Sequence, residues 1–289
     1  MRLINFVENN KDNAAIRCDD KVFPIKMLND KYNTEWSLTV QEIINNEEIF
    51  DLNKWYKDVI ANNCEKINEF LNYKDLTIGP LYRRTKRIWG IGLNYSEHAG
   101  DLAEKSPTGI PASFIKNEST ICGPNDNIII PTQSKKVTAE AELGVIIGKK
   151  CKNVEEKDWL EYVAGFTTIL DQTAEDILRL NPRYLTMVKN FDTFFSFGPE
   201  LVTPDEIKEL NNIKVRTMIN GKVHAENFIS NMTFSPSFLV SFYSKVFTWN
   251  PGDILSTGTP RAVHIQEGDI VGCEIDGFES LSNGVVNKN

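Results

Sequence analysis

Runs of β-branched and aromatic residues dominate the chain from Arg87 onward, and they limit its possible folds more than any other feature. Such runs, separated by turn-forming residues, are typical of short strands. The predicted strands are Ile88–Leu93, Ile128–Ile130, Leu143–Ile147, Tyr162–Leu170, Val215–Ile219, Asp253–Ser256 and Ile270–Ile275. Only two helical patterns interrupt them, near Thr173–Leu180 and Ser237–Val246. We therefore expect a β-rich domain in this part of the chain.

The first eighty residues follow a different pattern. Their strand-like pieces, separated by Asn, Asp and Lys turns, are Leu3–Val7, Ala14–Cys18 and Val22–Met27. Two helical patterns follow, the first beginning at the capping box Thr39-Val-Gln-Glu42 and the second passing through Trp55 and Ile60. We place a boundary near Gly79-Pro80, between a small α+β domain of residues 1–80 and a β-rich domain of residues 81–289.

Charge and hydropathy exclude several classes of function. The 289 residues include 40 acidic and 32 basic side chains, and the net charge of −8 argues against a broad nucleic-acid surface. No apolar run approaches the ~20 residues of a membrane helix, and the N-terminus has no secretory pattern. The five cysteines are scattered and odd in number, which matches neither a disulfide framework nor a CxxC zinc site. We expect a soluble, cytoplasmic protein without nucleic-acid or membrane partners.

Two glutamates two residues apart lead directly into the apolar run Leu143–Ile147. In a strand, Glu140 and Glu142 point to the same face, about 7 Å apart. Two like charges beside a buried strand repel each other and lose hydration unless a cation lies between them. Taken alone, the pair fits a solvated entrance to the strand better than a site.

Asp171 ends the apolar run Tyr162–Leu170 and precedes a predicted helix. It either caps that helix or joins a site at the end of the strand. Glu140, Glu142 and Asp171, with no histidine or cysteine nearby, suit an oxygen-preferring cation such as Mg²⁺, Mn²⁺ or Ca²⁺ better than zinc.

Three further features offer chemistry but have ordinary explanations as well. In Asn94-Tyr-Ser-Glu-His98-Ala-Gly-Asp101, helical spacing would place Asp101 one turn from His98 and make the imidazole a general base, or the two form a surface pair. The turn Thr257-Gly-Thr-Pro260 has small residues and backbone amides that can bind a carboxylate, although such turns are common. Lys189 has the pattern of a surface lysine.

Taken in order and at their spacing, these pieces resemble the fumarylacetoacetate hydrolase family from about Lys86 to about Val286. The matching motifs are Gly92-Leu-Asn-Tyr95 with His98, Glu140-x-Glu142 before a Gly-Val-Ile-Ile-Gly run, Tyr162-Val-Ala-Gly165 leading to Asp171, Lys189-Asn-Phe-Asp-Thr-Phe with Gly198-Pro199, Pro251-Gly-Asp253, and Thr257-Gly-Thr-Pro260. The resemblance implies a mixed β-sandwich roll in the C-terminal domain, usually assembled as a homodimer. The N-terminal eighty residues resemble only the variable front domain of longer members.

The resemblance also implies a role for each matching residue. Glu140, Glu142 and Asp171 fall on three ligands of Mg²⁺ or Mn²⁺, and Lys189 falls on a lysine near the metal. His98 falls on the general base, and Asp101 stands where acylpyruvases of the family have a glutamate. Thr259 falls on the residue that binds the substrate carboxylate, and we assign Gly258 and Tyr95 to substrate binding with it.

The reaction implied is metal-dependent hydrolysis of a C–C bond in an acylpyruvate-like 2-oxo acid, of the fumarylpyruvate type. The alternative is an isomerase, decarboxylase or dehydratase of the same family that acts on a 2-oxo dioate or a keto-deoxy sugar acid. A non-catalytic protein that kept the fold is disfavoured, because a purely structural metal site would need neither His98 nor Lys189.

Two positions depart from many hydrolytic members, which have an arginine four residues and a glutamine seven residues after the metal aspartate. Here these positions are Glu175 and Leu178. The exchange reverses one charge and removes one hydrogen-bond donor, which favours the alternative reactions. It also lets Glu175 add a carboxylate near the metal. We assign the missing positive charge to Arg183 as a substrate-binding residue; in the other interpretation, Arg183 pairs with Glu175.

Overall fold

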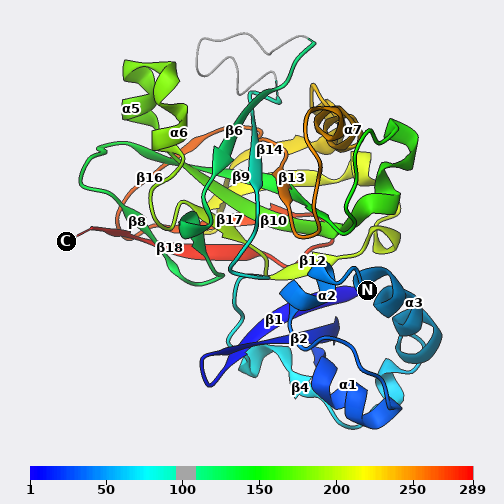
Figure 1. The fold of residues 1–289 in the computed structure, drawn as a ribbon. Helices are drawn as coiled ribbons and strands as arrows, with labels where there is room; N and C mark the ends of the chain where they lie inside the picture. Colours follow the sequence, from blue (N-terminus) through cyan, green and yellow to red (C-terminus); the bar gives the residue numbers. More distant parts are fainter. Residues whose placement is uncertain (96–108, 289) are drawn as a thin grey trace.

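The computed structural model describes residues 1–95 and 109–288, which form a sheet-rich α+β fold (Figure 1). The strands are β1 (Arg2–Glu8), β2 (Lys11–Cys18), β3 (Lys21–Pro24), β4 (Leu71–Asn72), β5 (Ile88–Gly92), β6 (Ala112–Lys116), β7 (Ile121–Cys122), β8 (Asn127–Ile130), β9 (Val137–Ile147), β10 (Val163–Ala174), β11 (Phe195–Phe197), β12 (Glu200–Val202), β13 (Lys214–Ile219), β14 (Lys222–Phe228), β15 (Ile254–Ser256), β16 (Val263–Ile265), β17 (Ile270–Ile275) and β18 (Leu281–Asn287). The α-helices are α1 (Ile25–Tyr32), α2 (Val40–Asn45), α3 (Ile49–Trp55), α5 (Glu175–Leu180), α6 (Leu185–Val188) and α7 (Pro236–Val246). The short 3₁₀ and π helices are η1 (Tyr56–Ile60), η2 (Cys64–Lys66), η3 (Tyr73–Asp75), η4 (Glu118–Thr120), η5 (Glu156–Tyr162), η6 (Pro182–Tyr184), η7 (Pro204–Glu206), η8 (Leu210–Asn212) and η9 (Ile229–Asn231). No helix in these two ranges combines the length and hydropathy needed to cross a membrane.

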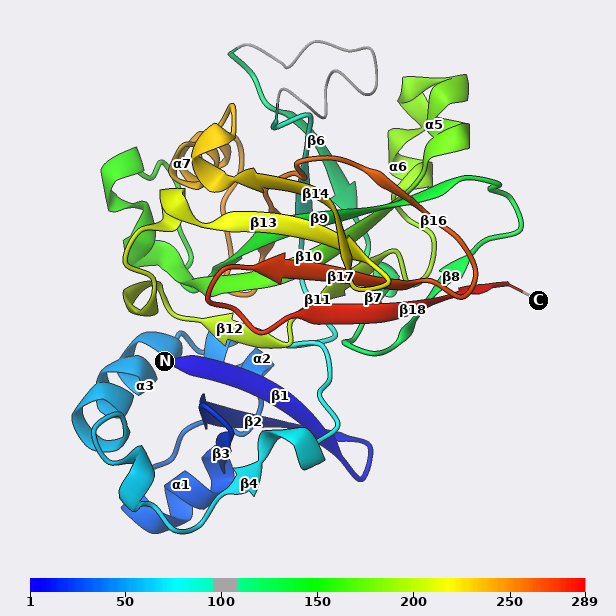
Figure 2. The same ribbon diagram turned by 180° about the vertical axis from the view of Figure 1, so that it is seen from behind.

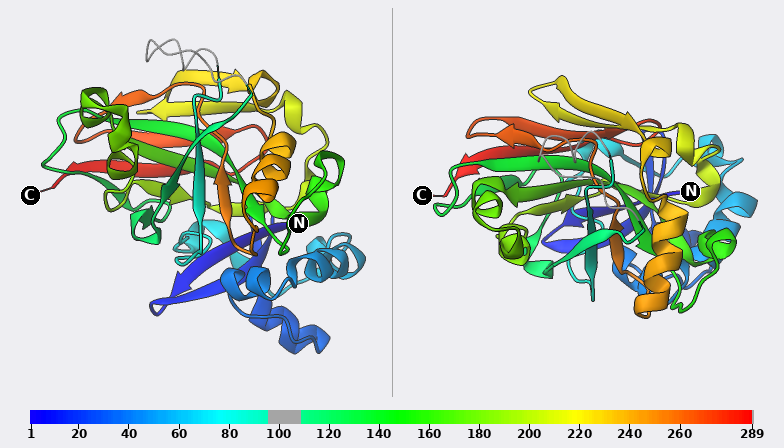
Figure 3. Two further views of the ribbon diagram at one scale, coloured as in Figure 1. Left: turned by 45° about the horizontal axis from the view of Figure 1, so that its top comes forward. Right: turned by 90° about the horizontal axis from the view of Figure 1, so that it is seen from above.

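Two sheets pack face to face. The larger sheet runs in the order β4-β3-β2-β1-β12-β10-β9-β15-β5-β6, with β11 also paired to β10, β16 to β9 and β7 to β11. The smaller sheet has the order β14-β13-β17-β18-β8 and lies in front of the larger one when the molecule is viewed from behind (Figure 2). Seen from above, its yellow-to-red strands form a layer beside the green strands β9 and β10 (Figure 3). This arrangement agrees with the predicted mixed sandwich.

Strand β9 divides its side chains between two faces, because successive residues of a strand alternate. Its odd-numbered residues, including Ala141 and Leu143, enter the main core with Val271 of the smaller sheet. Its even-numbered residues near the start of the strand, Glu140 and Glu142, therefore point to the opposite face. The antiparallel register of β9 and β10, with Asp171 opposite Glu140, brings the aspartate to that same face.

Farther along the strands, that opposite face becomes apolar. Ile146 of β9 and Ile169 of β10 belong to a second core, which they share with Leu3, Ile44 and Leu52 of the N-terminal elements. These elements, coloured blue, lie below the C-terminal strands in Figure 1, and β1 pairs with β12 so that the N-terminal strands extend the large sheet. We keep residues 1–80 and 81–289 as the proposed division, with a sheet and a core common to both.

The N-terminal region differs from the sequence prediction in two details. The predicted strand Val22–Met27 is too long: β3 ends at Pro24, which has no N–H to continue the ladder, and α1 begins at Ile25. A disulfide joins Cys18 to Cys64, a single pair that the sequence did not predict. The two residues are 46 positions apart in the chain, and only the packing of η2 against β2 brings them together. The capping box at Thr39 is confirmed, since its hydroxyl accepts from the Glu42 N–H at 3.2 Å.

Gly165, at a register shift in β10, is a point where the sheet tolerates no side chain. A Cβ there would lie 2.5 Å from the carbonyl oxygen of Val202, a backbone atom that cannot rotate away. We expect Gly165→Ala to lower the free energy of unfolding by about 1–3 kcal/mol, measured by guanidinium denaturation. Gly92→Ala is the matched control, because its nearest neighbour would be Ala112 Cβ at 4.0 Å. Equal stability of the two variants would contradict the prediction.

Candidate metal centre and substrate cavity

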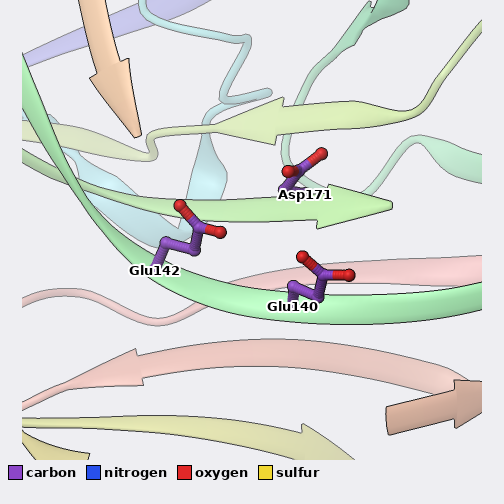
Figure 4. Close-up of side chains that lie close together, drawn as sticks. All are labelled: Glu140, Glu142 and Asp171. Atoms are coloured by element: carbon purple, nitrogen blue, oxygen red, sulfur yellow. The ribbon is translucent and has the colours of Figure 1, made fainter. Parts of the chain in front are cut away.

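Three buried carboxylates form a cluster on the face of the large sheet that β9 and β10 share. Glu140, Glu142 and Asp171 each contribute one oxygen to a group whose members all lie within 4.8 Å of one another (Figure 4). Their side chains project to the same side of the two strands and lie close together, as Figure 4 shows. Within the described residues this is the one group of three or more such ligands at that spacing. Oxygen donors of this kind suit Mg²⁺ or Mn²⁺.

Glu142 is the member of the cluster with unused binding capacity. Its Oε2 accepts hydrogen bonds from Ser256 Oγ at 2.5 Å and from the Gly258 N–H at 2.8 Å. Its Oε1 is buried without a hydrogen-bond partner among the described residues. Burial, followed by the negative charge of Asp171, raises the pKa of Glu142 to about 8. A buried carboxylate oxygen that lacks a donor and lies among like charges fits a cation ligand.

The turn after β15 supplies the donors for Glu142. Gly258 has a φ of +95°, and a Cβ at this position would lie 2.8 Å from Asn94 Cβ. Only glycine therefore allows the backbone N–H to approach the carboxylate here. The Asn94 side chain holds the turn by donating to the Thr257 carbonyl at 2.7 Å. The motif residues Asn94 and Gly258 thus act together on one metal-ligand candidate.

Two buried lysines compensate the cluster. Lys189 Nζ lies 2.8 Å from Glu140 Oε2 and 2.6 Å from Asp171 Oδ2, and Lys116 Nζ lies 2.5 Å from Asp171 Oδ1. Burial alone would lower the pKa of Lys189, but the carboxylates of Asp171 and Glu140 hold it above its ordinary value. Burial, together with the charge of Lys189, lowers the pKa of Lys116 to about 8, although Asp171 opposes that shift. Two ammonium groups among three carboxylates leave one negative charge. A proton on Glu142 would neutralise it, and a bound divalent cation would reverse it to one positive charge.

A cavity of about 540 Å³ lies beside the cluster. Its polar lining includes Glu140, Lys189, Thr259, Glu175 and Arg179. The remainder is mostly apolar and consists of Ile91, Leu93, Ala112, Phe114, Leu178, Pro182, Leu185 and Ala262, with Gly92, Ser113, Thr138 and Thr173. Lys189 is therefore the one buried lysine of the pair that reaches both the carboxylates and the cavity, while Lys116 is enclosed behind them.

Comparison with known proteins assigns this arrangement to a family. Residues 87–286 match the model of the fumarylacetoacetate (FAA) hydrolase C-terminal domain, which is more than half of the chain. The chain belongs to the fumarylacetoacetate hydrolase family. It is an enzyme of that family, and the matched range contains all three clustered carboxylates and both lysines.

Named relatives share more than a third of the aligned residues. A fumarylacetoacetate hydrolase domain-containing protein 2 homolog from Dictyostelium discoideum is 41% identical over 217 residues, covering 69% of this chain and 71% of its own. The mitochondrial oxaloacetate tautomerase Fahd2a of Rattus norvegicus is 38% identical over 217 residues, covering 72% and 69%.

Solved structures share the fold over the whole chain. Maleylpyruvate hydrolase from Sphingobium sp. SYK-6, in complex with manganese(II) and pyruvate, has a TM-score of 0.80 at 22% identity with complete coverage of both chains. The 5-carboxymethyl-2-hydroxymuconate delta-isomerase of Mycobacterium smegmatis has a TM-score of 0.77 at 24% identity, again with complete coverage. A hydrolase and an isomerase thus have the same fold as this member of the family.

The structure brings together most of the residues that the sequence suggested. Lys189 and Thr259 line the cavity, and Gly258 donates to Glu142. Tyr95 is buried in the main core and does not line the cavity; burial, then the charge of Glu142, raises the pKa of its hydroxyl. His98 and Asp101 lie outside the described residues, so their assignment as general base and partner stays a prediction.

Lys116 was missed by the sequence analysis, because the strand that carries it was missed as well. β6 places Phe114 and Lys116 on one face, and the Phe114 ring lies 4.5 Å from the Lys189 ammonium. Gly90 provides space for that ring, since a Cβ there would lie 2.2 Å from Phe114 Cζ. A lysine inside the apolar run Ala112–Lys116 was the available signal.

The helix after Asp171 is organised differently from the sequence interpretation. Glu175 pairs with Lys136 at 2.9 Å and with Arg179, and it is not part of the metal cluster among the described residues. Arg183 is exposed and is absent from the described lining of the cavity; its backbone N–H donates to Asn181 Oδ1 at 3.0 Å. The pairing of Arg183 with Glu175 is therefore wrong, because Arg179, one helical turn after Glu175, occupies that role.

Glu142→Gln tests the metal centre through stability. For the wild type, Mn²⁺ at about 100 times its Kd should raise the free energy of unfolding by about 2.7 kcal/mol, and the variant should lose most of this gain. Without metal at pH 7 the variant should match the wild type, because Glu142, with a pKa of about 8, is mostly neutral there and glutamine mimics it. Thermal melts with and without Mn²⁺ measure both effects, and the exposed Glu69→Gln variant is the control.

The same variant has a pH signature. A carboxyl with a raised pKa keeps a proton in the folded state that the unfolded chain releases, so its contribution to stability falls as pH rises from about 4.5 to about 8. In EDTA, the wild type should lose this stability across that window, and Glu142→Gln should lose less. Parallel pH profiles would contradict the assignment.

Lys116→Met tests the charge balance. Methionine has an unbranched side chain of similar length to lysine, but it leaves Asp171 Oδ1 without its cation. We therefore expect the metal-free protein to lose about 3–5 kcal/mol of unfolding free energy. Urea denaturation in EDTA is the measurement, and Lys157→Met, at an exposed position of η5, is the matched control. A loss no larger than that of the control would show that Lys116 is not needed to compensate Asp171.

Proposed function

We propose that the protein is a divalent-metal-dependent enzyme that interconverts the enol and keto forms of a 2-oxo dicarboxylic acid of the oxaloacetate type. The main observation behind this proposal is the cluster of three buried carboxylates beside Lys189 at the wall of the cavity. The reaction is supported by the rat relative, 38% identical, which is named an oxaloacetate tautomerase. It is also supported by Glu175 and Leu178, which replace the arginine and glutamine that hydrolytic members present to the substrate.

Glu140, Glu142 and Asp171 would hold the cation. When bound, it would supply a Lewis acid that binds the carboxylate and 2-oxo oxygens and stabilises enolate charge. Lys189 remains protonated because its carboxylate neighbours raise its pKa, so it places a fixed positive charge at the cavity wall where oxyanion charge develops. The Phe114 ring and Glu140 keep that ammonium in place.

Thr259 stands at the wall of the same cavity, with its hydroxyl donating to the Arg261 carbonyl at 3.1 Å. Binding of a substrate carboxylate would redirect this hydrogen bond. We keep His98, with Asp101, as the group that moves the proton at the carbon next to the 2-oxo group.

Hydrolysis of an acylpyruvate is the second candidate function, supported by the His98–Asp101 pair in the sequence. We also keep the homodimer and the cytoplasmic location as predictions from the sequence, although the rat relative is named as mitochondrial. Both Mg²⁺ and Mn²⁺ fit three carboxylates, and the maleylpyruvate hydrolase neighbour was solved with manganese(II).

The test follows the enol absorbance of oxaloacetate with Mg²⁺ or Mn²⁺ and assays pyruvate in parallel. Metal-dependent loss of absorbance without pyruvate supports tautomerisation, whereas pyruvate formed from oxaloacetate indicates decarboxylation. Pyruvate released from an acylpyruvate panel indicates hydrolysis.

We expect Lys189→Met to lower kcat about 100-fold or more, because it removes the preorganised charge, and Lys157→Met to retain activity. Full activity of Lys189→Met would contradict its role.

A further inference from the structure

A buried ion-pair cluster lies at the start of α5, away from the metal carboxylates. The buried Glu175 carboxylate is met by two cations, Lys136 through Oε2 and Arg179 through Oε1. Burial opposes ionisation of Glu175, but its hydrogen bonds with Lys136 and Arg179 lower its pKa, so the carboxylate stays charged. Glu175 is thus shared between two cations, and the neighbouring carboxylate of Asp176 is bound separately, by Ser134 Oγ and the Lys135 N–H.

Arg179 is the cation of this cluster that lines the cavity. Its Nε and Nη2 both contact Glu175 Oε1, with Nε at 2.6 Å, which fixes the guanidinium at one edge. Its Nη1 has no partner among the described residues, so N–H groups of the guanidinium remain available to donate hydrogen bonds to a ligand. The side chain is 52% exposed and lines the cavity that Glu140 and Lys189 also line.

The two polar regions of the cavity are separated along the chain. Asp171 of the metal end lies on β10, which ends at Ala174, whereas Arg179 lies on α5, which begins at Glu175. Apolar side chains, among them Leu178, Leu185 and Ile91, line the same cavity. A ligand that matches this lining has an anionic group at each end and a carbon chain between them.

We propose that Arg179 binds the second carboxylate of the substrate and makes the enzyme selective for 2-oxo dioates over 2-oxo monocarboxylates. This inference rests on the proposed function for the first carboxylate, which binds at the metal end. Glu175 is the positioning residue for Arg179, and Lys136 neutralises Glu175 so that Arg179 keeps its charge for the ligand.

Arg183 provides a matched control, because it is a second arginine only four residues away. It is exposed, does not line the described part of the cavity and has no ion pair among the described residues. If positive charge near the cavity raised the affinity for dioates in a general way, substitution of either arginine would lower that affinity. If the carboxylate binds in the cavity, only substitution of Arg179 would lower it.

The experiment uses 2-hydroxy acids that bind the metal but are not turned over. Calorimetric titration of the Mn²⁺-loaded protein compares racemic malate with lactate, and 2-hydroxyadipate with 2-hydroxyhexanoate, so that two dioate lengths are tested. We expect at least one dioate to bind 10-fold or more tightly than its monocarboxylate. Arg179→Met should reduce that preference to less than 3-fold, and Arg183→Met should retain it.

Three results would overturn the proposal: no preference for either dioate, a preference that persists in Arg179→Met, or an equal loss in Arg183→Met. These outcomes are independent of catalysis. If the Arg179-dependent preference appears but oxaloacetate is not tautomerised, the proposed reaction fails and the carboxylate site stands. If tautomerisation occurs without that preference, the reaction stands and the role of Arg179 fails.

Discussion

Repulsion among three buried carboxylates is the constraint on which the site depends. Glu140 and Glu142 lie on the same face of β9 because strand residues two apart must do so, and the register of β10 adds Asp171 directly opposite. No single strand can neutralise such a cluster. The compensating groups therefore come from separate segments of the chain: Lys116 from β6, Lys189 from the end of α6, and the Gly258 N–H from the turn after β15.

The same sheet face also explains how the N-terminal region and the site coexist. The face carries isoleucines at one end of β9 and β10 and carboxylates at the other. The N-terminal helices cover the apolar end, so they stabilise the sheet without covering the cavity (Figure 1). Chemistry is confined to the end where β6, α5 and α6 meet the strands.

The sequence predicted what depends on local period and on motif order, and it missed what depends on packing. Alternation alone placed Glu140 and Glu142 on one face, and the family motifs added Asp171, Lys189 and Gly258. The lysine that ends the run Ala112–Lys116 was a signal that the residue is buried, but nothing local identifies its partner, which lies 55 positions away. The Cys18–Cys64 disulfide was missed for the same reason. For the partner of Glu175, the spacing of Glu175 and Arg179 at i and i+4 was the signal that favoured Arg179 over Arg183.

One fold accommodates a maleylpyruvate hydrolase and a hydroxymuconate isomerase at 22% and 24% identity to this chain, so the fold alone does not determine the reaction. What can differ between such enzymes is the set of groups that face the substrate beyond the metal. In this chain, Glu175 and Leu178 replace the arginine and glutamine of hydrolytic members, and the Glu175 carboxylate is already bound by Lys136 and Arg179. Glu175 is therefore not a free base or a fourth metal ligand; it holds a cation at a fixed place on the cavity wall. Relative to the hydrolytic pattern, an acid stands at position 175 and an arginine stands one helical turn farther along α5, at position 179. Under the proposed function, this arrangement would weaken stabilisation of a tetrahedral oxyanion and favour binding of a second anionic group, as an enzyme that shifts a proton without breaking a carbon–carbon bond requires.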